Sequence, residues 1–189
     1  MTSTATTTIT LSDLTGTWTL DPSHTRVGFV ARHAMVTKVR GSFNEFDGTA
    51  TIDGADLTKS SVQLNIKVDS IDTRDANRDG PLRSGDFLAM EEYPEITFTS
   101  TSVASTGDTS LDLTGDLSIK GITNSVTIPF EFEGAATDPF GADRAGFEGS
   151  IVINRKDYGV TWNAALETGG VLVSDKITLE FEVSAVKNA

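Results

Sequence analysis

Residues 61–68 read Ser-Val-Gln-Leu-Asn-Ile-Lys-Val, and this stretch decides the fold class. From Val62 to Val68 apolar side chains alternate with polar ones, so one face of the segment is apolar and the other is polar. A period of two is typical of a β-strand that buries one face. The stretch is therefore predicted to be a strand in a sheet that covers an apolar core.

The same alternation recurs along most of the chain. The seven further segments that show it are residues 27–33, 39–52, 95–103, 111–119, 126–133, 144–153 and 177–184. The connections between several of them, such as residues 105–108 and 120–121, are too short for crossover helices, so neighbouring strands are expected to be antiparallel. Closing the sheet on itself removes its exposed edges, and strands near ten residues suit a long barrel. The sequence predicts an all-β fold, an eight-stranded antiparallel barrel, with a two-sheet sandwich as the competing arrangement.

The alternation stops over residues 74–93, between the third and fourth predicted strands. Leu82, Phe87, Leu88 and Met90 follow a roughly helical spacing there, and Ser84 is a suitable residue to cap a short helix that ends before Pro94. A short helical insert is therefore expected in this segment. The domain prediction is a flexible tail over residues 1–13 and a single barrel domain over residues 14–189.

Composition excludes several classes of protein. The chain has 189 residues, with 15 Lys and Arg against 27 Asp and Glu, and a formal net charge of −12. Such an acidic chain repels a phosphate backbone, so no nucleic-acid partner is expected. No apolar run is long enough to span a membrane, and the absence of Cys excludes disulfides and thiolate metal sites. The Thr-rich residues 1–10 lack the features of a secretory signal, so a cytoplasmic location is expected.

Small residues interrupt the inward-facing positions of the predicted strands. Ala31, Ser100, Gly115 and Gly149 stand where a solid barrel would carry large side chains. They favour a cavity for a long apolar guest, although they also suit bulges or room for a large neighbour such as Trp162. The predicted lining of this tunnel is Phe29, Ala31, Phe43, Val62, Leu64, Phe87, Phe98, Leu113, Leu117, Ile128, Phe130, Phe147, Ile151 and Trp162.

No motif for catalysis or for a cofactor is present. Only two His occur, and His33 has inward parity near the end of its strand, where it is expected to be hydrogen-bonded or to contact a polar ligand head together with Arg78 or Arg83. Residues 75–86 resemble a twelve-residue calcium loop. Arg78 and Arg83 lie inside that loop, its last acid is Asp rather than Glu, and a strand precedes it. No catalytic residue, metal or cofactor is therefore predicted.

Taken together, the motifs resemble the YceI-like family of bacterial polyisoprenoid-binding proteins, which have a lipocalin-like barrel. The matching segments, in chain order, are Trp18–Thr25, Val27–Phe29, His33, Val39–Phe43, Ser70–Thr73, Asn77–Asp79, Leu82–Ser84, Asp86–Phe87, Tyr93–Pro94, Ile96–Phe98, Gly115–Leu117, Lys120–Thr123 and Arg155–Gly159.

This resemblance implies binding, transport or storage of a long-chain isoprenoid lipid, such as an isoprenoid quinone or a polyprenyl phosphate, without catalysis. Pro81 stands where the family often carries a His, which affects the choice of head group. Many members are exported, whereas this sequence shows no signal. An enzyme or stress protein acting on a lipid or small molecule is the alternative function, and a calcium-binding protein is the least favoured. Exposed strand edges or a wide mouth would also allow a homodimer.

Overall fold

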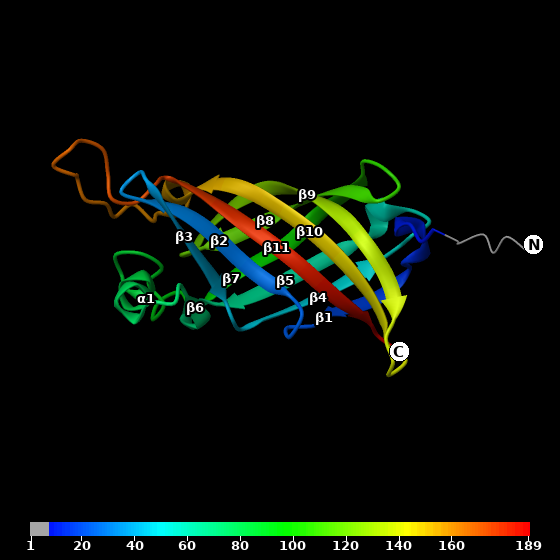
Figure 1. The fold of residues 1–189 in the computed structure, drawn as a ribbon. Coiled ribbons are helices and arrows are strands. Elements are labelled where there is room, and N and C mark those ends of the chain that lie inside the picture. Colours follow the sequence, from blue (N-terminus) through cyan, green and yellow to red (C-terminus); the bar gives the residue numbers. More distant parts are fainter. Residues whose placement is uncertain (1–7) are drawn as a thin grey trace, which may run out of the picture.

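The computed structural model describes residues 8–189, so residues 1–7 of the expected tail lie outside the described residues. Within that range, eight antiparallel strands close into a barrel, because β1 pairs with both β4 and β11 (Figure 1). In the order of the ring, they are β1 (Gly16–Leu20), β4 (Phe46–Ile52), β5 (Ser61–Lys67), β7 (Glu95–Ser105), β8 (Ser110–Ile119), β9 (Ile122–Thr137), β10 (Asp143–Asn154) and β11 (Lys176–Lys187). The predicted closed barrel is confirmed.

Three further strands extend the barrel at one end. β2 (Arg26–His33) continues from β1 and pairs with β11 and β3 (Thr37–Phe43), and β3 pairs with the two-residue β6 (Ile71–Asp72). The segment 39–52, predicted as one strand, is divided at residues 44–45, where the chain passes from β3 to β4. β1 is not among the predicted strands because it has five residues, of which only Trp18 is buried. So short a segment does not show a clear alternation.

The insert beside β6 contains one helix, α1 (Ala76–Arg83). Asp75 caps its N-terminus by accepting a hydrogen bond from the Asn77 backbone N–H at 2.9 Å, and Ser84 lies at its C-terminal end. The expectation that Ser84 begins a helix is wrong. The chain does not continue as a helix after Ser84, since Ala89 has a φ of 49°.

Apolar residues of the insert close that end of the barrel, and short 3₁₀ helices close the other. Leu82, Leu88 and Met90 pack against the main core. At the other end lie η1 (Leu11–Asp13) and η2 (Leu57–Lys59), whereas η3 (Val68–Ser70) and η4 (Arg155–Tyr158) lie at the end beside α1. Leu11 is 3% exposed, so residues 11–13, expected in the flexible tail, belong to the packed domain because an apolar side chain anchors them.

Candidate functional site

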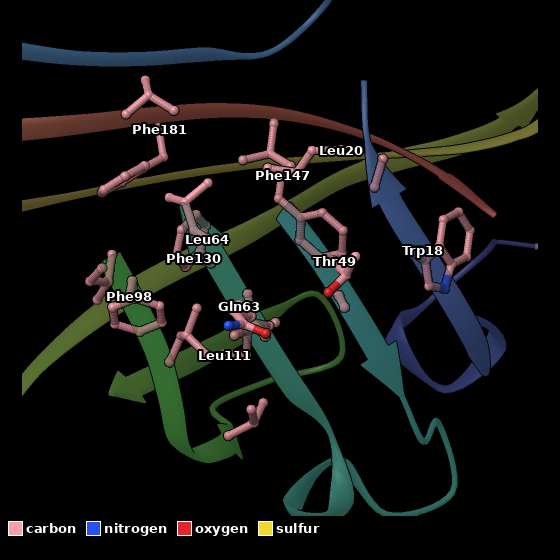
Figure 2. A pocket seen from close by; sticks show the side chains of 18 of the residues that line it. Trp18, Leu20, Thr49, Gln63, Leu64, Phe98, Leu111, Phe130, Phe147 and Phe181 are labelled. Atoms are coloured by element: carbon pink, nitrogen blue, oxygen red, sulfur yellow. The ribbon is translucent and has the colours of Figure 1, made fainter. Parts of the chain in front are cut away.

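An apolar cavity of about 170 Å³ lies inside the barrel. Figure 2 shows side chains from several strands around it, with Trp18 toward one end and Phe98 and Phe181 toward the other. The wall consists of Leu11, Trp18, Leu20, Val27, Gly28, Phe43, Thr49, Ala50, Ile52, Leu57, Ser60, Val62, Gln63, Leu64, Ile66, Ile96, Phe98, Val103, Leu111, Leu113, Leu117, Ile119, Ile128, Phe130, Phe147, Leu179, Phe181, Val183 and Ala185.

The cavity is elongated, because the residues that line it follow β8 from Leu111 to Ile119, about 27 Å along the tilted strand at about 3.4 Å per residue. An engineered cavity of about 150 Å³ in another protein holds a benzene molecule. A similar free volume spread over the length of a barrel is suited to a thin extended chain rather than to a compact ring system.

The wall is almost entirely apolar. Within the described residues it carries no charged side chain, and its polar groups are those of Trp18, Thr49, Ser60 and Gln63. The Trp18 indole N–H already donates to the Leu14 carbonyl at 2.9 Å. Because apolar contact is the main interaction the wall offers, it can select a guest by shape and apolar surface.

Most of the predicted tunnel residues lie in this wall. Those that line it are Phe43, Val62, Leu64, Phe98, Leu113, Leu117, Ile128, Phe130 and Phe147. Phe29 and Ile151 pack against the main core, and Ala31 is half-buried on β2. Phe87 and Trp162 contact each other, with ring centroids 5.3 Å apart, outside the cavity wall.

The small residues contribute to the cavity in a different way from the one predicted. A Cβ at Gly115 would lie 2.5 Å from the Phe98 ring, and a Cβ at Gly149 would lie 2.6 Å from the Phe130 ring. Ser100 marks an irregularity in the pairing of β7 with β8. At Gly115 and Gly149 the prediction of empty space is wrong, because aromatic rings occupy it, and at Ser100 the pairing irregularity agrees with the alternative of a bulge. We infer that the glycines let these rings lie against the wall and not across the bore.

The three predicted head-group residues lie outside the cavity wall. His33 is exposed at the end of β2. Arg78 donates to the Thr73 hydroxyl at 2.8 Å and to the Thr73 carbonyl, and Arg83 donates to the carbonyls of Asp69 and Ile71. In this structure both arginines attach the insert to the segment that contains β6.

The segment that resembles a calcium loop is α1 and its caps. Asp75 accepts the capping hydrogen bond, and the buried Asp79 accepts hydrogen bonds from the backbone N–H and hydroxyl of Thr73 at 2.9 and 2.6 Å. A calcium loop needs these carboxylates to converge on one point. Within residues 8–189, no group of three or more His, Asp or Glu has the geometry to hold a metal ion.

Sequence reasoning missed part of the wall and Arg155, which organises the irregular segments at the α1 end of the barrel. We call these segments, residues 68–94 and 155–175, the rim. Leu11, Trp18 and Leu57 lie in the wall, but they come from short elements in which no long alternation shows their direction. Arg155 is 5% exposed and donates to the carbonyls of Val160, Trp162 and Ser174 at 2.7 to 2.9 Å. Burial lowers the pKa of Arg155, because it disfavours the charged form. This side chain fixes the loop from Val160 to Asp175.

Comparison with known proteins gives consistent matches over nearly the whole chain. The model of the YceI-like domain matches residues 18–185. UPF0312 protein SAS2572 of Staphylococcus aureus (strain MSSA476) is 39% identical over 169 residues, which cover 89% of this chain and 95% of that protein. No helix within the described residues combines the length and the apolar character needed to cross a bilayer.

Solved structures share the fold. BcnA of Burkholderia cenocepacia has a TM-score of 0.77 and 25% identity, covering 87% of this chain and 98% of that one. The YceI protein of Campylobacter jejuni has a TM-score of 0.72 and 26% identity, covering 84% and 90%. A polyisoprenoid-binding domain from Saccharophagus degradans has a TM-score of 0.69 at 16% identity, covering 90% and 98%. The chain belongs to the YceI-like domain family.

Proposed function

We propose that this protein binds the chain of an isoprenoid lipid, such as an isoprenoid quinone or a polyprenyl phosphate, inside the barrel and stores or carries it. The observation that carries the proposal is the long apolar cavity with no charged side chain in its described wall. Transfer of apolar surface from water contributes about 25 cal/mol per Å². The similar fold of the Saccharophagus degradans polyisoprenoid-binding domain supports this choice of ligand.

We further propose that the lipid is bound without being converted. General acid–base chemistry needs a titratable side chain within hydrogen-bonding reach of the reacting group. The described wall offers hydroxyl, amide and indole groups only. A polar head group therefore lies beyond the end of the cavity next to α1. Arg78 and Arg83 belong to the insert at that end, and His33 is the last residue of β2.

Trp18 offers a direct test, because it lies in the cavity wall and the chain has two Trp. In a Trp162→Phe background, titration with a prenyl alcohol should change Trp18 fluorescence and saturate at one ligand per protein. Ala50→Phe places a larger side chain in the cavity and should weaken binding at least about tenfold, which corresponds to a loss of about 1.4 kcal/mol in binding free energy. Val152→Phe, at an exposed position on β10, is the matched control and should bind as the parent does.

Native mass spectrometry of protein purified without detergent provides the second measurement. A stoichiometric isoprenoid, recovered unchanged after incubation, is the expected result. Absence of any bound lipid together with no fluorescence response would overturn the proposal, and a changed lipid mass would refute the non-catalytic part. Arg83→Ala tests the head-group prediction, since it should weaken a prenyl phosphate more than the matching alcohol.

A further inference from the structure

The β2–β3 hairpin differs in charge from the rest of the molecule. Residues 22–44 contain Arg26, Arg32, Lys38 and Arg40 and no Asp or Glu, in a chain whose net charge is −12. Arg26 lies 3.7 Å from Glu180 on the neighbouring β11. The other three cations belong to the outer part of the hairpin, which is therefore a basic element on an acidic protein.

Those three cations have no acidic partner among the described residues. Arg32 and Lys38 stand directly opposite each other in the β2–β3 pairing, and Arg40 follows on the same face of β3. All three side chains are exposed and take part in none of the ion pairs within residues 8–189. Like charges directly opposite each other destabilise a strand pair. Their arrangement is suited to an anion supplied from outside the chain.

The tip of the same hairpin is apolar and strained. Met35 is 62% exposed and Val36 is 76% exposed. The turn closes with the Val36 N–H donating to the His33 carbonyl at 3.1 Å, and its central residues Ala34 and Met35 have φ of 50° and 63°. Asn-Gly adopts this left-handed turn at a lower cost than Ala-Met. Strain that places an apolar side chain in solvent suggests a function at the tip.

A second segment extends the apolar tip. The Ala34 N–H donates to the Leu172 carbonyl at 2.8 Å, and Met35 lies against Gly170. Val171 is 39% exposed beside them. We call Met35, Val36 and Val171 the tip patch. Glu167 is the one charged residue of segment 160–174, so within residues 22–44 and 160–174 together four cations stand against one acid.

The opposite end of the barrel shows the contrast. Phe140, in the β9–β10 turn, is 95% exposed, but Asp138 and Asp143 flank it. In Figure 1 this turn and the β2–β3 turn lie at opposite ends of the barrel. Apolar exposure combined with unpaired cations is thus a property of the β2–β3 end.

We propose that the β2–β3 end docks on an anionic phospholipid surface. The tip patch enters the headgroup layer, and Arg32, Lys38 and Arg40 contact lipid phosphates. The acidic remainder of the protein is repelled by the same surface, which fixes the orientation of the barrel axis toward the membrane. This proposal goes beyond ligand binding and holds whether or not the cavity is occupied.

Co-sedimentation with vesicles tests the docking. The protein should bind vesicles of equimolar phosphatidylcholine and phosphatidylglycerol at low salt, and should not bind phosphatidylcholine alone. The Lys38→Gln, Arg40→Gln variant should weaken partitioning about fivefold for each charge removed, or about 25-fold in all. Met35→Ser with Val36→Ser should weaken it about tenfold or more. Phe140→Ser, the matched control, should bind as the parent does.

An Ala34→Asn, Met35→Gly variant separates docking from a structural role. It relieves the strained turn, so Tm should rise while vesicle binding falls. Ala50→Phe should retain vesicle binding while losing the prenyl alcohol, which distinguishes failure of docking from failure of the cavity proposal. No binding to anionic vesicles, or an equal loss in the tip variants and in Phe140→Ser, would overturn the docking proposal.

Discussion

The barrel wall and the rim beside α1 are held together by different interactions. In the wall the strands pair with each other and bury apolar side chains in register. At the rim, irregular segments leave backbone carbonyls outside the strand ladders, and Arg78, Arg83 and Arg155 donate to them. Buried backbone polar groups need partners. Stability is therefore spread over many residues in the wall and concentrated in a few guanidinium groups at the rim.

Replacing Arg155 should have the largest effect. Arg155→Met leaves the carbonyls of Val160, Trp162 and Ser174 without their donor. Each buried polar group left unpaired costs about 1–3 kcal/mol, but removing the guanidinium also removes the cost of burying its charge. The free energy of unfolding should therefore fall by about 3–5 kcal/mol, toward the low end of the sum for three carbonyls. Chemical denaturation followed by circular dichroism measures it.

Arg26→Met is the control for that change. Arg26 is partly exposed, and its closest acidic partner, Glu180, lies 3.7 Å away. An exposed ion pair contributes about 0–1 kcal/mol. If both substitutions reduced stability equally, the contrast between rim and wall would be wrong.

The wall could be predicted from the sequence, whereas the rim could not. Alternation over β5 or β8 fixes which side chains point inward, because a strand has no other way to bury one face. Phe87 and Trp162 lie in segments without a regular period, so their positions depend on hydrogen bonds made by distant residues such as Arg155. Arg78 and Arg83 were predicted near a mouth, but their carbonyl partners could not be deduced from sequence.

What occupies the space beside the inward-facing glycines also could not be deduced from the sequence alone. A glycine at an inward position is compatible with empty space or with a ring from the next strand. Phe130 and Gly149 are directly paired in β9 and β10, which makes the ring the occupant. Sequence parity gives the face of each residue, but not which neighbour fills the space beside it.

A substitution in the wall should have an intermediate effect. Leu117 is 4% exposed and lines the cavity. Leu117→Ala should lower the free energy of unfolding by about 2–3 kcal/mol, the low end for such changes, because part of its surroundings is already empty. The same variant should admit a bulkier prenyl alcohol in the Trp18 fluorescence titration. A loss comparable with that of Arg155→Met would remove the distinction between the two regions.

A carboxylate cluster at the end opposite α1 predicts a dependence on pH. Asp21 accepts hydrogen bonds from Ser23, Arg144 and His24, which hold its pKa well below the usual range. The stabilisation is present above the ordinary pKa of about 3.9 and is lost as pH falls toward the folded-state value. Below about pH 4 the free energy of unfolding should therefore decrease.

Asp21→Asn isolates this contribution. It should cost about 1.5 kcal/mol at neutral pH and flatten the decline below about pH 4, because a neutral amide does not titrate. Asp47→Asn, at an exposed carboxylate on β4 that makes no side-chain hydrogen bond or ion pair within the described residues, is the matched control and should leave stability at neutral pH unchanged. Equal acid sensitivity of Asp21→Asn and the parent would assign the decline to other carboxylates.

The smallest effect is expected where the rim leaves a polar group unpaired. Tyr158 is 2% exposed, and its hydroxyl makes no hydrogen bond of good geometry among the described residues, since the nearby Asn124 amide donates to the Asp157 carbonyl. Burial raises the pKa of Tyr158 because the phenolate is disfavoured away from water. Tyr158→Phe removes this hydroxyl and should raise the free energy of unfolding by about 0.5 kcal/mol. Denaturation of the variant measures this change, and ultraviolet titration of the parent reports the raised pKa. A loss of stability in Tyr158→Phe would mean that the hydroxyl is hydrogen-bonded in solution and stabilises the rim, as Arg155 does.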